Sequence, residues 1–201
     1  MAGKKLTTMG KSLAELELLN CVKVLGKGET LLYPTDTIWG IGCDATNESA
    51  VSKVYRIKER PEDKSFILLV SSEEMLADYV EAVPPTAYDL IRATDDMPLT
   101  IIYSKGKNLP SNVVAKDGSV AIRVTNHPFC KELIDRFGKP IVSTSANLSG
   151  QPFPLKLADI SEIVIERVDH VAVVEENPLT ELRPSRIIKL EADGMFRVVR
   201  E

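Results

Sequence analysis

Two patterns of apolar and polar positions follow one another along the chain. Short unbroken apolar runs, such as 66–70 (FILLV), are typical of strands buried on both faces of a sheet. Other segments carry apolar residues three and four positions apart, as at Val51, Val54 and Tyr55, which predicts a helix with one apolar face. The succession of the two patterns predicts an α/β fold.

Capping residues, glycines and prolines bound these segments. Four helices are expected to begin at capping residues: at Ser12 (to about Leu25), at Asn47 (to before Pro61), at Ser71 (a capping box with Glu74) and at Pro128 (with Gly138 as C-cap). A fifth helix is expected over 157–168. The expected strands are 29–33, 66–70, 99–103, 120–124, 140–142, 171–174, 186–190 and 196–200. A loop is expected at 35–42, and a break at Pro84 and Pro85. We therefore predict one domain over 1–201, with a twisted mixed open sheet and helices on both faces.

Composition narrows the classes of protein. Over 201 residues, 44% are apolar and 27% charged, which excludes a disordered chain, and the net charge of −4 argues against a surface built to coat nucleic acid. No apolar run approaches the ~18 residues of a membrane span, and the start MAGKKLTTMGK lacks an apolar stretch. Three cysteines without CxxC spacing and two histidines fit reduced thiols better than disulfides or a zinc site. We expect a cytoplasmic protein without membrane contact.

Cations gather around Pro61 in the stretch IKERPEDKS. On a helix Lys58 and Arg60 would point about 200° apart, but Pro61 disfavours helical geometry at Arg60, and an extended chain would place both on one side. With Lys64 beyond the proline they would form a clamp for a polyphosphate. The alternative is a solvated face that complements the C-terminal dipole of the preceding helix.

Polar side chains at positions i, i+2 and i+4 follow the strand expected at 140–142. If the strand geometry continues, Ser143, Ser145 and Asn147 line one face at the carboxyl end of a strand, where open α/β sheets bind ligands. The alternative is a Ser/Asn-rich turn that bonds its own backbone. Arg123 interrupts another apolar strand and therefore needs an anionic partner, either a structural carboxylate or that of a substrate.

Common catalytic and nucleotide-binding motifs are absent. The sequence contains no GxSxG elbow, GxGxxG loop or GxxxxGK[ST] loop. A bound nucleotide would therefore not be held by either common glycine-rich loop.

Five segments in order resemble the YrdC-like threonylcarbamoyl-AMP synthase family, in its short single-domain form. They are YPTDTIWGIGCDA (33–45), IKERPEDKS (57–65), PLT (98–100), VAIRV (120–124) and STSANLSGQP (143–152). The resemblance covers roughly 29–200. It implies an enzyme that converts L-threonine, bicarbonate and ATP into threonylcarbamoyl-AMP and pyrophosphate, for the threonylcarbamoyladenosine of transfer RNA.

The resemblance also implies roles for particular residues. The triphosphate, with its Mg²⁺, would be held by Lys58, Arg60 and Lys64, of which the first two would be catalytic. The rest of the nucleotide would be bound by Ser145, Asn147 and Arg200. Threonine would be enclosed by Thr37, Arg123, Ser143 and Ser185. No metal-ligating protein residue is expected.

Among the positions that depart from the resembled pattern, which include Trp39 and Ser65-Phe66, three motivate an alternative. They are Leu69, Phe153 and Arg186. The alternative is a YrdC-like paralogue that binds nucleotide or RNA without making the intermediate. For the synthase, the further expected partners are proteins that transfer the threonylcarbamoyl group and, weakly, transfer RNA or double-stranded RNA.

Overall fold

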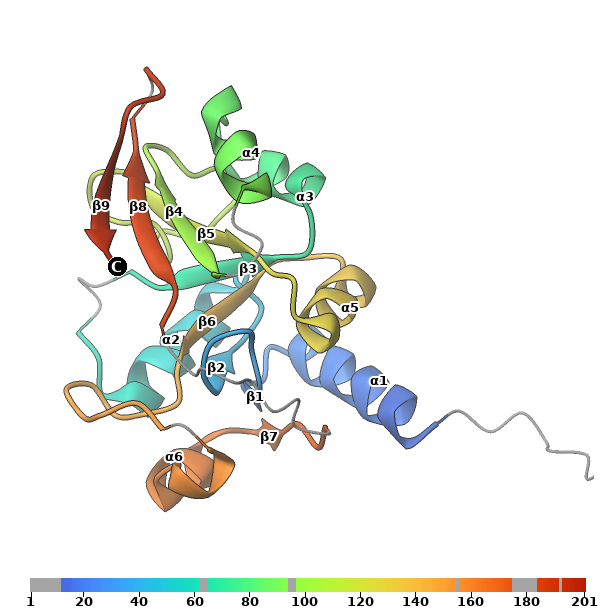
Figure 1. Ribbon diagram of the computed structural model, residues 1–201. Helices are drawn as coiled ribbons and strands as arrows, with labels where there is room; N and C mark the ends of the chain where they lie inside the picture. Colours follow the sequence, from blue (N-terminus) through green and yellow to red (C-terminus); the bar gives the residue numbers. More distant parts are fainter. Residues whose placement is uncertain (1–11, 62–64, 94–96, 155, 175–183, 192) are drawn as a thin grey trace, which may run out of the picture.

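Nine strands form one mixed sheet in the order β7-β1-β2-β6-β3-β5-β4-β8-β9 (Figure 1). The computed structural model describes residues 12–61, 65–93, 97–154, 156–174, 184–191 and 193–201. The strands are β1 (Leu31–Tyr33), β2 (Gly40–Gly42), β3 (Ile67–Val70), β4 (Leu99–Tyr103), β5 (Val120–Val124), β6 (Ile141–Ser145), β7 (His170–Val171), β8 (Arg186–Leu190) and β9 (Phe196–Arg200). The pairs β1/β7, β3/β5 and β4/β8 are parallel and the others antiparallel. The predicted mixed sheet is confirmed.

Helices cover both faces of this sheet. They are α1 (Leu13–Gly26), α2 (Glu48–Lys58), α3 (Glu73–Tyr79), α4 (Pro85–Arg92), α5 (Pro128–Phe137), α6 (Glu162–Arg167) and the 3₁₀ turn η1 (Leu157–Asp159). Leu69 of β3 packs in one core cluster with residues of α1 and α5, whereas Leu68 packs in a second cluster with residues of α2, α3 and α6. Because successive strand residues point to opposite faces, the two clusters lie on opposite sides of the sheet.

The predicted helix caps are found at several ends. The Ser12 hydroxyl accepts the Glu15 N–H at 3.1 Å, and the Asn47 side chain accepts the Ala50 N–H at 3.2 Å. Gly138 ends α5 with φ of 76°, a left-handed conformation that glycine adopts without steric cost. Local sequence therefore sets these ends.

The loop predicted at 35–42 is wrong at its end, because 40–42 form β2. At Gly42 a Cβ would lie 2.3 Å from the Val142 carbonyl oxygen, so glycine lets β2 approach its neighbour closely. The strand predicted at 140–142 is longer than expected and reaches Ser145, through its pairing with β2 and β3.

Three helix boundaries also differ from expectation. The cap of α3 is Ser72, whose hydroxyl accepts the Met75 N–H, while Ser71 is buried. Pro85 is the first residue of α4 instead of separating two elements, because the N–H groups in the first turn of a helix have no partner within the helix and proline lacks only this group. The helix expected over 157–168 is divided, because the extended, buried Ile160 separates η1 from α6.

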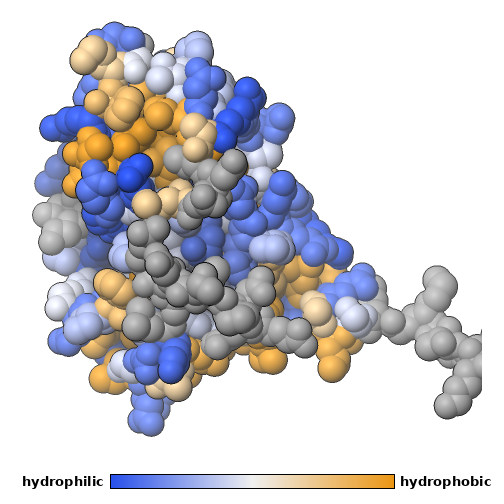
Figure 2. Space-filling model, viewed as in Figure 1, coloured by the Kyte–Doolittle hydropathy of each residue, from blue (hydrophilic) through white to orange (hydrophobic). Residues whose placement is uncertain are grey.

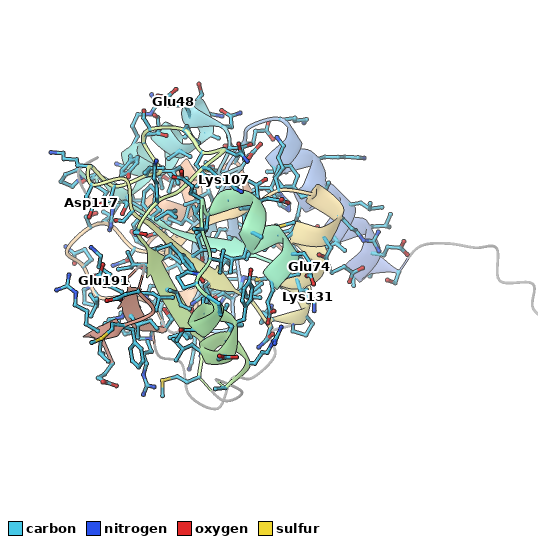
Figure 3. The ribbon with its side chains drawn as sticks, turned by 90° about the horizontal axis from the view of Figure 1, so that it is seen from above. Glu48, Glu74, Lys107, Asp117, Lys131 and Glu191 are labelled. Carbon is cyan, nitrogen blue, oxygen red and sulfur yellow. The ribbon has the colours of Figure 1, made fainter. Side chains whose placement is uncertain are left out.

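The surface carries apolar side chains over the edge of the sheet formed by β4, β8 and β9 (Figure 2). On β9, Phe196, Val198 and Val199 are all about half exposed. Charged side chains cover the helices, and Glu74 of α3 lies close to Lys131 of α5 (Figure 3). Among the described residues, no helix has the length and apolarity needed to cross a bilayer.

Candidate active site

A cavity of about 360 Å³ opens on the sheet face that also carries α1 and α5. Seven of the predicted site residues line it: Thr37, Arg60, Arg123, Ser143, Ser145, Ser185 and Arg200. Ile67 points to the same face of β3 as Leu69, yet Leu69 packs under the helices and Ile67 lines the cavity. The cavity therefore lies on a part of this face that α1 and α5 do not cover.

Strand register brings the central polar residues together. Ser143 pairs with Ile67 of β3, and Ser145 pairs with Gly40 of β2. Because β6 continues to Ser145, Ser143 and Ser145 project from the same face, as their spacing predicted. Arg123 joins them from β5, whose neighbour in the sheet is β3.

Arg123 is a buried cation held by a carboxylate that the sequence reading missed. Its Nη2 lies 3.1 Å from Asp36 Oδ1, with side-chain exposures of 4% and 14%. Asp36 Oδ2 also accepts the Thr125 hydroxyl at 3.3 Å, and Arg123 Nη1 donates to Thr37 Oγ1 at 3.4 Å. Asp36 and Thr37 thus fix the guanidinium, while its Nε is buried without a hydrogen-bond partner among the described residues.

Asp36 could have been found from a general rule. A buried arginine requires a nearby anion, and Asp36 is the acidic residue in the loop that carries Thr37. Arg123 can therefore pair with both a structural carboxylate and a substrate carboxylate, because Asp36 occupies only one edge of the guanidinium.

Ser185 and Arg200 form a further wall of the cavity. Arg200 donates from Nε and Nη2 to the Ser185 carbonyl oxygen at 3.0 and 2.8 Å. The Ser185 hydroxyl lies 2.8 Å from Thr100 Oγ1. Burial, and then the charge of Arg123, lower the pKa of Arg200, so its positive charge gains from an anionic ligand.

Arg60 reaches the cavity by a different local geometry from the one predicted. Lys58 is the last helical residue and Glu59 adopts a left-handed conformation with φ of 50°. The chain therefore turns at Glu59 instead of extending before Pro61. Arg60 donates to the Ser65 carbonyl oxygen at 3.0 Å, and its guanidinium carbon lies 5.1 Å from the centroid of the Phe66 ring.

Lys58 lies behind the cavity wall rather than in it. It is 2% exposed, and its Nζ donates to the backbone oxygens of Ser145 and Asn147 and to Asn147 Oδ1. Burial, and next the charge of Arg60, lower the pKa of Lys58 to about 7. The predicted arrangement of Lys58 and Arg60 on one side of an extended chain is wrong, although both residues adjoin Ser145.

Asn147 and Lys64 are the remaining predicted residues. Asn147 lies past the end of β6, accepts the Ser145 hydroxyl, and lines a neighbouring hollow of about 530 Å³ that shares Phe153 and no other residue with the cavity. Lys64 lies outside the described residues. Of the three departures that motivate the alternative, Phe153 lines the cavity, Leu69 is buried in the core, and Arg186 pairs with Glu201 at 3.3 Å.

The described lining of the cavity contains no carboxylate, histidine or cysteine. Three guanidinium groups and several hydroxyls suit an anionic, polyoxygenated ligand. They provide neither a nucleophile activated by a base nor a set of protein ligands for a metal ion.

Comparisons with known proteins agree with this geometry. Residues 23–201 match the model of the Sua5/YciO/YrdC family, whose description reads "Telomere recombination". The chain belongs to this family. The relatives of this Sua5/YciO/YrdC chain include a threonylcarbamoyl-AMP synthase from Pseudoalteromonas translucida, 37% identical over 88% of this chain and 94% of the relative. Another, from Klebsiella pneumoniae, is 36% identical over 94% of this chain and 99% of the relative.

Solved structures of the family share the fold. The E. coli YciO structure superimposes with a TM-score of 0.80 at 26% identity, over 95% of this chain and 91% of that one. The structure of P. abyssi Sua5 complexed with L-threonine gives a TM-score of 0.81 at 26% identity, over 90% of this chain. This chain covers only 52% of the length of that Sua5 protein.

Proposed function

We propose that this protein is a threonylcarbamoyl-AMP synthase, which forms threonylcarbamoyl-AMP and pyrophosphate from L-threonine, bicarbonate and ATP. The observation that carries the proposal is the placement of Arg60, Arg123 and Arg200 around one cavity with the hydroxyls of β6. The names of the synthase relatives support it.

Threonine would bind at the Arg123 end of the cavity. Its carboxylate can pair with the guanidinium of Arg123, which lines the cavity, while Asp36 keeps the guanidinium in place. The hydroxyls of Thr37, Ser143 and Ser185 would surround the rest of the amino acid. The threonine complex of P. abyssi Sua5 supports this ligand class.

ATP would bind at the Arg60 end, as MgATP. The metal ion would arrive on the phosphate oxygens, because the described cavity lining offers no acidic ligand. Arg60 and Arg200 would neutralise phosphate charge, with Lys64 as the expected third cation. Ser145 and Asn147 would contact the nucleotide, and Lys58 would hold the backbone that carries them.

The chemical step needs positioning more than covalent catalysis. The amine of threonine bonds to the carbon of bicarbonate, a C–O bond breaks and water leaves, which gives an N-carboxylate (carbamate). A carbamate oxygen then attacks the α-phosphorus of ATP. The bond between the α-phosphorus and the bridging oxygen to the β-phosphate breaks, and pyrophosphate leaves. The carbamate is itself the nucleophile, so fixed charges and orientation suffice. A cytoplasmic setting, bicarbonate as the carbon source, RNA contacts and downstream transfer proteins remain part of the proposal.

The experiment is a pyrophosphate-release assay with each substrate omitted in turn. We expect release to require ATP, threonine and bicarbonate together. Release that is equal without threonine would overturn the proposal and would favour the nucleotide-binding paralogue.

A further inference from the structure

We propose that Glu17, Cys21 and His170 form a zinc-binding site that joins α1 to β7. Glu17 Oε1 lies 2.7 Å from His170 Nε2 and 3.6 Å from Cys21 Sγ, and all three ligand atoms lie within 4.8 Å of one another. No other group of three such side chains occurs in the described part of the chain. None of the three lines the cavity, so this proposal does not depend on the proposed function.

The ligand set and its spacing fit a tetrahedral Zn²⁺ ion. One thiolate, one imidazole and one carboxylate are the ligands that zinc prefers, and bonds of about 2.0 to 2.3 Å place ligand atoms roughly 3.3 to 3.7 Å apart. The distance between sulfur and carboxylate oxygen already has this value. For a tetrahedral ion the separation of Glu17 Oε1 and His170 Nε2 must widen by about 0.6 Å, and the separation of the sulfur and the imidazole nitrogen, which is at most 4.8 Å, must come to roughly 3.5 Å.

The backbone around these ligands is held in place. Glu17 and Cys21 are one turn apart on α1 and face the same side. Next to His170, the Asp169 carboxylate accepts the Thr30 N–H and hydroxyl, both at 2.8 Å, and the Asp169 N–H donates to Thr30 Oγ1. The Val173 N–H donates to Glu17 Oε1 at 3.0 Å. These contacts fix the chain next to His170 and the position of Glu17 Oε1.

Cys21 differs in its surroundings from the other two cysteines. All three thiols are buried, but the thiols of Cys43 and Cys130 donate to the backbone carbonyl oxygens of Asp44 and Pro34. The Cys21 sulfur instead lies beside a carboxylate and an imidazole. His170 and Glu17 are 23% and 15% exposed, so an ion can enter from solvent and keep one water ligand. Binding would release the thiol proton and leave a neutral site.

Cobalt spectroscopy of the intact protein tests the site. Co²⁺ added to the wild type should give a thiolate-to-cobalt charge-transfer band at one equivalent, with the visible bands of a tetrahedral ion. The band should vanish in Cys21→Ser and persist in Cys130→Ser, the matched control from the same core cluster. Absence of the band in the wild type, or its persistence in Cys21→Ser, overturns the proposal.

Zinc affinity and thermal unfolding provide a second measurement. Zn²⁺ should raise the thermal unfolding midpoint of the wild type. Removing a residue that only contacts a metal ligand can weaken metal binding by roughly 100-fold, so His170→Asn, which removes a ligand, should weaken Zn²⁺ binding by more than this. This variant decides the matter if Cys21→Ser does not fold. Equal Zn²⁺ affinity of the wild type and His170→Asn would show that Glu17 and His170 form only a hydrogen-bonded link.

Discussion

The two ends of the cavity are built by different means. At the Arg123 end, β5 places a buried cation against Asp36 of the loop between β1 and β2, before any ligand binds. At the Arg60 end, the cations follow a helix C-terminus and a turn, and Lys58 is already engaged with backbone oxygens. A position within the sheet therefore orients Arg123 before a ligand binds, whereas the direction of Arg60 depends on the left-handed conformation of Glu59.

The largest expected effect is at the Arg123 end. Arg123→Met leaves the Asp36 carboxylate buried without its cation, which should cost about 3 to 5 kcal/mol of unfolding free energy. It should also lower kcat/KM for threonine by roughly 100-fold or more, because a lost buried charge pair costs about 2 to 5 kcal/mol. Denaturant unfolding and pyrophosphate release measure the two quantities.

A double variant separates the structural role from the binding role. Adding Asp36→Asn to Arg123→Met removes the unpaired charge, so stability should recover while threonine use does not. Recovery of threonine-dependent activity in the double variant would show that Arg123 does not bind threonine.

The second effect is at the Arg60 end. Arg60→Ala should weaken ATP binding by roughly 10-fold, since one charge-assisted interaction of about 1.5 kcal/mol is lost. Adding Lys58→Ala should weaken it further, because Lys58 holds the backbone that carries Ser145 and Asn147. Threonine binding should change much less, because Arg123 and Asp36 are untouched. Calorimetry against the exposed Lys131→Ala control measures both. Equal losses for the two ligands would mean that the ends are not separate.

The third effect is a pH dependence that belongs to Lys58. Its pKa is about 7 in the folded protein and 10.5 as the ordinary value, so between these pH values the unfolded chain binds more protons. Stability should therefore rise with pH from about 7 towards 10.5, by at most about 1.4 kcal/mol per pH unit, and be unaffected by this group below 7. The difference in unfolding free energy between wild type and Lys58→Met should show this slope, and a flat difference would contradict it.

The smallest effect is at the mouth of the cavity. Phe153 is 41% exposed and borders both the cavity and the neighbouring hollow. Phe153→Ala should raise the KM for ATP a few-fold while stability changes by less than about 0.5 kcal/mol. A change in the KM for threonine alone would place Phe153 at the other end of the site.

The sequence predicted the strand residues of the cavity better than the turn that places Arg60. Alternation along the strand placed Ser143 and Ser145 on one face, because side-chain direction in a sheet has a fixed period of two, and the apolar strand around Arg123 predicted its need for an anion. The turn at Glu59 was missed because a left-handed non-glycine residue leaves no clear mark in the sequence. Asp36 and the cluster at Glu17 were missed because their partners lie 87 and 153 positions away, at distances that local patterns do not encode.

If one cavity joins threonine, bicarbonate and ATP, carbon-labelled bicarbonate must enter the nucleotide product. With ¹³C-bicarbonate, we expect a nucleotide product that contains threonine, AMP and the labelled carbon, formed together with pyrophosphate. An adenylate of threonine without the label, or ATP turnover that gives no such product, would contradict the proposed function.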